Sequence, residues 1–225
     1  MPSFFTDFLP LILGSAIVPM QIIFTALLLG SPERGVLKGI LFIAGMTTVR
    51  LIQGFVFGFI LVGVSNTSDS SKHNAITSTL LLVIGIMLLI TAYRQWRHED
   101  DPDAPPPKWL TMIETITPVK AFGVGFALVA IAPKLWVFTL NAIAVIGEAQ
   151  LGRPDSITAF LVFVLLAQSL ILLLILMRII VPGQATKVLN GLTGWLTKHN
   201  RVLMITISLV FGLYFLVKAI NRFLA

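Results

Sequence analysis

The sequence contains no cysteine and few charged residues. Without cysteine, the chain can form no disulfide, zinc–thiolate site or iron–sulfur cluster. Only 12% of its 225 residues are charged and 56% are hydrophobic, whereas soluble domains average about 25% charged residues. This balance excludes an ordinary soluble enzyme and predicts an integral membrane protein without a separate soluble domain. We therefore interpret the formal net charge of +6 as membrane topology and expect no nucleic-acid partner.

Catalytic and metal-binding groups are also scarce inside the hydrophobic segments. The three histidines, His73, His98 and His199, lie between those segments, and no aspartate or glutamate lies deep within one. The membrane segments thus offer no candidate for a metal cage, a proton relay or a nucleophile–base pair. We expect that the protein is not an enzyme and that it holds neither a cofactor nor a metal.

Six segments are apolar over a length that can cross a bilayer, which takes about 20 residues. They cover residues 8–32, 39–63, 75–93, 121–147, 156–177 and 202–217, the last continuing to about residue 224. We therefore expect an all-α integral membrane protein with six transmembrane helices.

Lysine and arginine are distributed unevenly over the loops between these segments. One side carries ten: Arg34, Lys38, Arg94, Arg97, Lys108, Lys120, Arg178, Lys187, Lys198 and Arg201. The other side carries four: Lys72, Arg153, Lys218 and Arg222. The positive-inside rule assigns the first side to the cytoplasm. We expect a multi-pass protein of the cytoplasmic membrane with both termini outside.

The first and fourth segments resemble each other in sequence. AIVPMQIIFT at residues 16–25 and AIAPKLWVFT at residues 130–139 share Ala, Ile, Pro, Phe and Thr without a gap, at a constant offset of 114. Because three spans form each unit, the second unit enters the membrane from the opposite side, as in inverted-topology repeats. The predicted organisation is a first three-helix repeat at 1–93, a cytoplasmic linker at 94–120 and a second repeat at 121–225.

Two cytoplasmic loops carry apolar residues at helical spacing, at residues 109–116 and 188–196. This pattern predicts short amphipathic helices at the membrane interface, with membrane lipids as their partners. Recruitment of a specific protein partner is the alternative.

Pro19 and Pro133 occupy equivalent positions inside the first and fourth segments. Each proline lacks an N–H, so the carbonyls of Ser15 and Val129 lose their helical partners. Lipid cannot satisfy a freed carbonyl, and paired breaks in inverted halves point to a central binding site. Two ordinary packing kinks are the alternative.

Arg50 and Lys134 are the two cations placed deep within predicted spans. Each costs about 3 kcal/mol at the bilayer centre on insertion scales. Because no acidic residue lies at that depth, we interpret them as contacts for an anionic group such as a phosphate, sulfate or carboxylate. Alternatively, they donate hydrogen bonds to the carbonyls freed at Pro19 and Pro133.

Uncharged polar side chains within the spans complete the candidate substrate-binding set, and we expect them to line a cavity between the halves. They are Gln21, Thr25, Gln53, Thr139, Asn141 and Gln168. Such residues also serve as hydrogen-bonding links between helices. Gly54 and Gly58 form a GxxxG motif, which indicates close helix packing within the chain or in a homo-oligomer.

Several short motifs occur in an order typical of a known family. They are Leu9-Pro10-Leu11, Ser31-Pro32, Arg94-Gln95-Trp96-Arg97, Lys108-Trp109, Thr117-Pro118 and Ala121-Phe122-Gly123-Val124-Gly125. Over nearly the whole chain, the sequence resembles the glycopeptidolipid- and sulfolipid-addressing protein family of the lysine-exporter (LysE-type) superfamily. The resemblance implies six helices in two inverted halves and the movement of lipids or other small molecules across the cytoplasmic membrane. The family commonly has Asn-Pro-Lys-Asn where this chain has Ala132-Pro133-Lys134-Leu135, so two flanking amides are missing.

Together these features predict a secondary exporter that moves a lipid or another small anionic amphipathic molecule by alternating access. Two alternatives remain open. One is an exporter of a small solute, such as an amino acid or an ion, and the other is a non-transporting membrane scaffold for envelope-lipid synthesis.

Overall fold

The computed structural model describes the backbone of residues 2–65, 70–97 and 116–224, without the side chains of residues 2–6, 59–65, 70–77, 80, 133, 134 and 222–224. Within these residues the chain is helical and has no strand, which confirms the predicted all-α class. The helices are α1 (Pro2–Ala16), α2 (Pro19–Gly30), α3 (Gly35–Ser65), α4 (Ser70–Arg97), α6 (Pro118–Ile131), α7 (Pro133–Glu148), α8 (Arg153–Ala167), α9 (Ser169–Ile180) and α10 (Pro182–Leu224). The predicted amphipathic helix at 109–116 lies, apart from its last residue, outside the described residues.

Three pairs of consecutive helices are bent at short breaks. The bend is 45° between α1 and α2, 69° between α6 and α7, and 58° between α8 and α9. With each pair taken as one span, and with α3 and α10, the described residues hold up to five candidate membrane spans. The predicted span at 75–93 lies in α4, which is not one of these five and whose side chains are only partly described. The count of six spans therefore stays a prediction.

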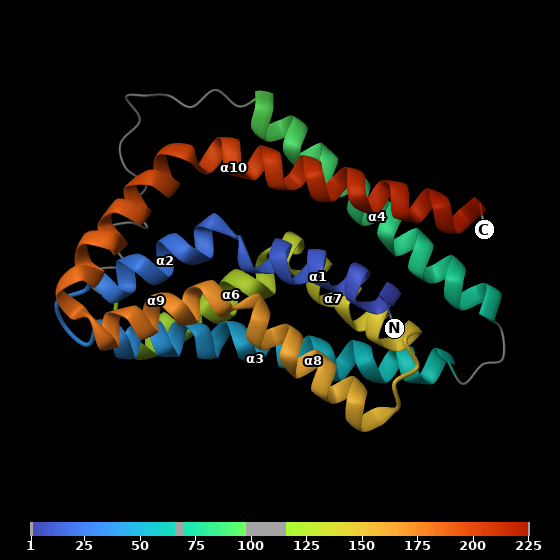
Figure 1. Ribbon diagram of the computed structural model, residues 1–225, viewed down its shortest axis with the longest axis horizontal. Coiled ribbons are helices and arrows are strands. Elements are labelled where there is room, and N and C mark those ends of the chain that lie inside the picture. The colour runs from blue at the N-terminus through green and yellow to red at the C-terminus, as the bar shows by residue number, and fades with distance from the viewer. Residues whose placement is uncertain (1, 66–69, 98–115, 225) are drawn as a thin grey trace.

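The helices run mostly lengthwise, so that their ends gather at two ends of the molecule (Figure 1). One end holds the turn between α2 and α3, the start of α6 and the junction of α9 with α10. The opposite end holds the start of α1, the end of α10 and the junction of α7 with α8. The start of α1 and the end of α10 thus lie toward the same end of the molecule.

Prolines position two of the breaks at equivalent places in the two halves. Pro19 is the first residue of α2 and Pro133 is the first residue of α7, at the predicted offset of 114. The residues before them, Val18 (φ −103°, ψ 105°) and Ala132 (φ −82°, ψ 104°), are both extended. A proline disfavours the helical region for the residue that precedes it, which explains both backbones.

The third break corrects the prediction of one continuous span at 156–177. It falls at Gln168 (φ −111°, ψ 6°), where the sequence has neither proline nor glycine. The Gln168 amide nitrogen donates to Thr47 Oγ1 at 3.0 Å and to the Val164 carbonyl at 3.3 Å. A side-chain amide that bonds the backbone competes with the helix ladder, and this competition accompanies the bend.

The segment at 188–196 is also more than the short interfacial helix that its pattern predicts. It belongs to α10, which has no proline after Pro182 and would measure about 65 Å if straight, twice the hydrocarbon thickness. Figure 1 shows this helix crossing one end of the molecule before it turns to run beside α4. Leu189 and Leu196 pack into the buried core, while Trp195 stays exposed. Tertiary packing therefore buries part of the predicted apolar face.

Apolar side chains form two buried clusters and also much of the surface. One cluster joins α2, α3, α6, α9, the start of α10 and Leu135 of α7, and the other joins α1, α4, the rest of α7, α8 and the end of α10. Large hydrophobic residues such as Phe55 and Leu173 are exposed, as expected where lipid is the solvent. Gly54 packs against Phe160 of α8, whereas a Cβ on Gly58 would meet nothing within 4 Å. The first glycine of the GxxxG motif thus serves helix packing inside this chain.

Candidate functional site

The middle of α3 passes close to two of the three breaks. Thr47 exchanges hydrogen bonds with Gln168, which sits at the break between α8 and α9. Ten residues on, the ring of Phe57 meets Trp136 edge-on, with ring centroids 5.9 Å apart, just after the break between α6 and α7. Arg50 and Gln53 lie on α3 between these two contacts.

The pairing of α2 with α3 brings the remaining break to the same level. Gly39 lies against Leu29, and Phe42 stacks on Phe24 with ring centroids 6.0 Å apart. Because the helices are antiparallel, each step back along α2 matches one step forward along α3. If this register continues along both helices, Arg50 lies level with the break at residues 17–18. The central stretch of α3 therefore contacts two of the three breaks, and the register of α2 places the third break at the same level along the molecule.

Arg50 is fully buried, and none of its three guanidinium nitrogens has a hydrogen-bond partner within the described part of the chain. Candidate acidic partners are remote in sequence from the middle of the spans. Asp7 begins one candidate span and pairs with Lys218 at 3.0 Å, and Glu148 ends another. An unpaired buried cation is expensive in a protein interior, so its retention points to a role in binding.

Five more described side chains have buried polar atoms without a partner in the described chain: Ser15, Gln21, Ser31, Gln53 and Ser78. Ser31 directly follows α2 and Ser78 lies in α4, whereas the other three lie nearer the breaks or Arg50. Gln53 lies one turn beyond Arg50 on the same face of α3, and Ser15 and Gln21 flank the break at residues 17–18. The amide atoms of Gln21 and Gln53 and the hydroxyl of Ser15 have no partner among the described residues. Because buried polar atoms are nearly always hydrogen-bonded, each of these groups is a candidate to bind a polar ligand.

The other uncharged candidates are buried, and their side chains form hydrogen bonds within the protein. Thr25 donates to the Gln21 carbonyl at 2.8 Å, and its repeat equivalent Thr139 donates to the Leu135 carbonyl at 3.1 Å. Asn141 donates to the Val137 carbonyl at 2.9 Å, while Gln168 binds Thr47 as described above. Bonds from a side chain to the carbonyl four residues earlier are common inside helices and favour a structural role.

The break between α6 and α7 is closed by a residue that the sequence analysis did not single out. The indole nitrogen of Trp136 donates to the carbonyls of Val129 and Ala130, each at 3.0 Å. Val129 is the residue whose carbonyl Pro133 deprives of its helical partner. A tryptophan three residues after a mid-span proline is the signal that could have indicated this cap. The side chains of Pro133 and Lys134 lie outside those described, so the predicted role of Lys134 stays a prediction.

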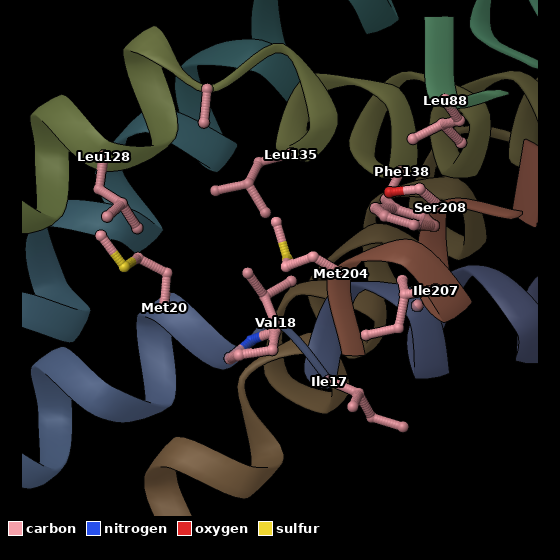
Figure 2. A pocket seen from close by; sticks show the side chains of 13 residues that line it. Ile17, Val18, Met20, Leu88, Leu128, Leu135, Phe138, Met204, Ile207 and Ser208 are labelled. Carbon is pink, nitrogen blue, oxygen red and sulfur yellow. The ribbon is translucent and has the colours of Figure 1, made fainter. Parts of the chain in front are cut away.

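A cavity of about 270 Å³ lies where the two proline breaks meet, and its lining is almost entirely apolar. Pro19 is the one described member of the predicted site set that lines it; Arg50 and the uncharged candidates do not. Figure 2 shows Met20, Leu135 and Met204 around this space, with Ile17 and Ile207 nearby. The sequence predicts polar side chains in such a cavity, whereas in the structure the cavity wall is almost entirely apolar and the described polar side chains of the predicted set lie outside it.

This arrangement defines a class: a helical membrane protein with broken spans, a buried arginine that has no partner among the described residues, and an apolar cavity at the breaks. The family model of Sap, the sulfolipid-1-addressing protein, matches residues 8–221. The chain therefore belongs to the sulfolipid-addressing protein family, whose name ties it to lipid export or localisation. Neither the curated proteins nor the solved structures contain a match to this chain.

Proposed function

We propose that this chain is a secondary exporter that moves an anionic amphipathic lipid across the cytoplasmic membrane, and that it is not an enzyme. The observation that carries the proposal is Arg50, a fully buried guanidinium without a partner among the described residues. It lies on the stretch of α3 that contacts two of the helix breaks, so a charge bound there would sit inside the bilayer.

The chemistry of Arg50 favours an oxyanion as its ligand. A charge at the bilayer centre costs about 3 kcal/mol on insertion scales, and a bound anion offsets this cost. The planar guanidinium matches sulfate, phosphate and carboxylate groups in bidentate geometry, and Ser15, Gln21 and Gln53 can donate further hydrogen bonds. The family name refers to a sulfolipid, and a lipid sulfate has this charge and shape.

Movement of the ligand would use the proline breaks as hinges. In the proposed topology, residues 1–93 and 121–225 are inverted repeats joined by the linker at 94–120, with the basic loop ends in the cytoplasm and both termini outside. Discontinuous helices at equivalent positions of two inverted halves are typical of transporters that rock around a central site. The described breaks at Val18 and Ala132 support this alternating-access mechanism.

A lipid-translocation assay in proteoliposomes tests the proposal. Fluorescent lipids with a sulfate, phosphate or choline headgroup are added to otherwise identical vesicles, and dithionite reports the fraction of each in the outer leaflet. We expect protein-dependent movement of the anionic lipids to exceed that of the choline lipid by roughly tenfold or more.

The variant Arg50→Gln should remove this preference. The variant Arg50→Lys keeps the charge but not the planar bidentate donor group, so it should retain part of the preference. Lys218→Gln is the matched control, because Lys218 pairs with Asp7 away from the site. Folding of each variant is checked by size-exclusion chromatography and thermal unfolding. If folded Arg50→Gln protein moves anionic lipid at the wild-type rate, the proposal is wrong.

A further inference from the structure

The apolar cavity at the proline breaks differs in chemistry from the buried polar side chains described above. It is lined from six helices and two breaks, and Ser208 is the one lining residue with a hydroxyl group. Desolvation of a charged or strongly polar ligand there would meet too few compensating hydrogen bonds. The cavity therefore selects for hydrocarbon.

The size of the cavity suits a segment of an alkyl chain. Its volume of about 270 Å³ exceeds the roughly 150 Å³ of an engineered apolar cavity that stays dry and binds benzene. Two of its lining residues, Met20 and Met204, carry flexible side chains that adapt to irregular apolar ligands. An occupant with many conformers, such as an acyl chain, fits a wall of this kind.

The cavity also opens to the surface of the helix bundle. Ile17 is 43% exposed, and Val18, Met20 and Met204 are half-buried, so the lining reaches the outside of the helix bundle. That outer surface is rich in exposed large hydrophobic side chains. In a membrane, the apolar molecules next to such an opening are lipid acyl chains, and a chain can enter laterally without crossing water.

We infer that this cavity is a binding site for one acyl chain of a membrane lipid. The inference deepens the proposed function and rests on it for the lipid's role as cargo. Met46 and Val49, in the turn before Arg50, share one buried cluster with Leu135, which lines the cavity. One packed layer thus connects the chain site with the anion site, and the cavity would change shape whenever the broken helices move.

Photolabelling with a chain-directed probe tests this site without requiring transport. The protein is reconstituted in phosphatidylcholine nanodiscs that contain phosphatidylcholine with a diazirine on one acyl chain, and labelled peptides are mapped by mass spectrometry. We expect labelling at Met20 and Met204 to exceed labelling at Leu173, an exposed residue outside the cavity, and to be competed by unlabelled long-chain lipid.

Filling the cavity should remove this labelling. Ala132→Phe and Met204→Trp each place a larger side chain in it, and Leu173→Phe is the matched control on the lipid-facing surface. In a filled variant that remains folded, labelling at Met20 should fall by roughly tenfold while labelling at Leu173 stays unchanged. Equal labelling of Met20 in the wild type and both filled variants, or labelling no stronger than at Leu173, would overturn the chain site.

The arms of the experiment also separate the two proposals. Because the probe carries a zwitterionic headgroup, its labelling does not depend on Arg50. Intact cavity labelling together with no anionic-lipid movement in the transport assay would overturn the exporter alone. Movement that continues with the cavity unlabelled would overturn the chain site alone.

Discussion

The two proline breaks begin from nearly the same sequence and end in different surroundings. AIVP leads into α2 and AIAP leads into α7, yet the bends are 45° and 69°. In the second half, Trp136 donates to the carbonyl that Pro133 frees. In the first half, the equivalent position is Ile22, which has no side-chain donor, and Ser15 and Gln21 lie beside the break without partners in the described chain.

This difference teaches how one backbone defect can serve two purposes. A freed carbonyl in hydrocarbon is costly, so each break needs a donor from somewhere. The second half supplies the donor from its own sequence and closes the break. The first half leaves Ser15 and Gln21, which flank its break, without partners in the described chain and so open to a ligand. We therefore expect the second break to contribute mainly to stability and the first mainly to binding.

The largest expected effect on stability comes from removing the tryptophan cap. Trp136→Phe keeps an aromatic ring against Phe57 but deletes the donor to Val129 and Ala130. We expect the variant to lose about 1–3 kcal/mol, because buried carbonyls are left unsatisfied. Thermal unfolding in detergent measures the change. Trp96→Phe, at a residue 65% exposed, is the control; equal losses in both variants would contradict the capping role.

Removing polar groups at the first break should affect binding and not stability. Ser15→Ala deletes a buried hydroxyl that has no partner among the described residues. We expect the unfolding temperature to stay the same or rise slightly. Movement of an anionic lipid should fall by roughly two- to tenfold, which is the effect of one lost hydrogen bond. The proteoliposome assay and thermal unfolding are run side by side. A clear loss of stability with normal transport would reverse the assignment of the two breaks.

The third break should depend on a modest link between helices. Thr47→Val and Gln168→Leu each remove the bond between α3 and the junction of α8 with α9. A double-mutant cycle on unfolding free energies should give a coupling near 0.6 kcal/mol, the average for hydrogen bonds between membrane helices. Zero coupling would mean that this contact does not hold the bend.

The smallest effect on stability and transport is expected at Thr25 and Thr139, where the two halves have the same residue and the same hydrogen bond. Thr25→Val and Thr139→Val each remove a hydroxyl that bonds the carbonyl four residues earlier in its own helix. Both variants should change stability by less than about 0.5 kcal/mol and leave lipid movement intact. A transport defect in Thr25→Val alone would extend the binding site further along α2.

The sequence predicts those parts of the fold that depend on local chemistry. Pro19 and Pro133 locate two breaks because a missing N–H interrupts a helix wherever it falls. The break at Gln168 has no such signal, since it depends on a partner, Thr47, that is 121 residues away. The course of α10 was equally hidden, because burial of Leu189 and Leu196 requires helices from both halves.

Some features of the candidate site can likewise be predicted from the sequence, whereas others depend on tertiary structure. The depth of Arg50 in an uncharged segment is visible in the sequence, and the structure places this residue fully inside the protein. Hydrogen bonds that occupy Thr25, Thr139 and Asn141 depend on rotamers that spacing does not reveal. The apolar cavity is also invisible in the sequence, because its wall is assembled from helices that are distant along the chain.

The central claim is that the first break, with Arg50 level with it, binds an anionic lipid. The most direct test is a mass-spectrometric inventory of the lipids that copurify in mild detergent with the wild type, Arg50→Gln and Lys218→Gln. We predict that one anionic lipid is enriched over the bulk membrane in the wild type and in Lys218→Gln but not in Arg50→Gln. The same bulk composition in all three proteins would contradict the account.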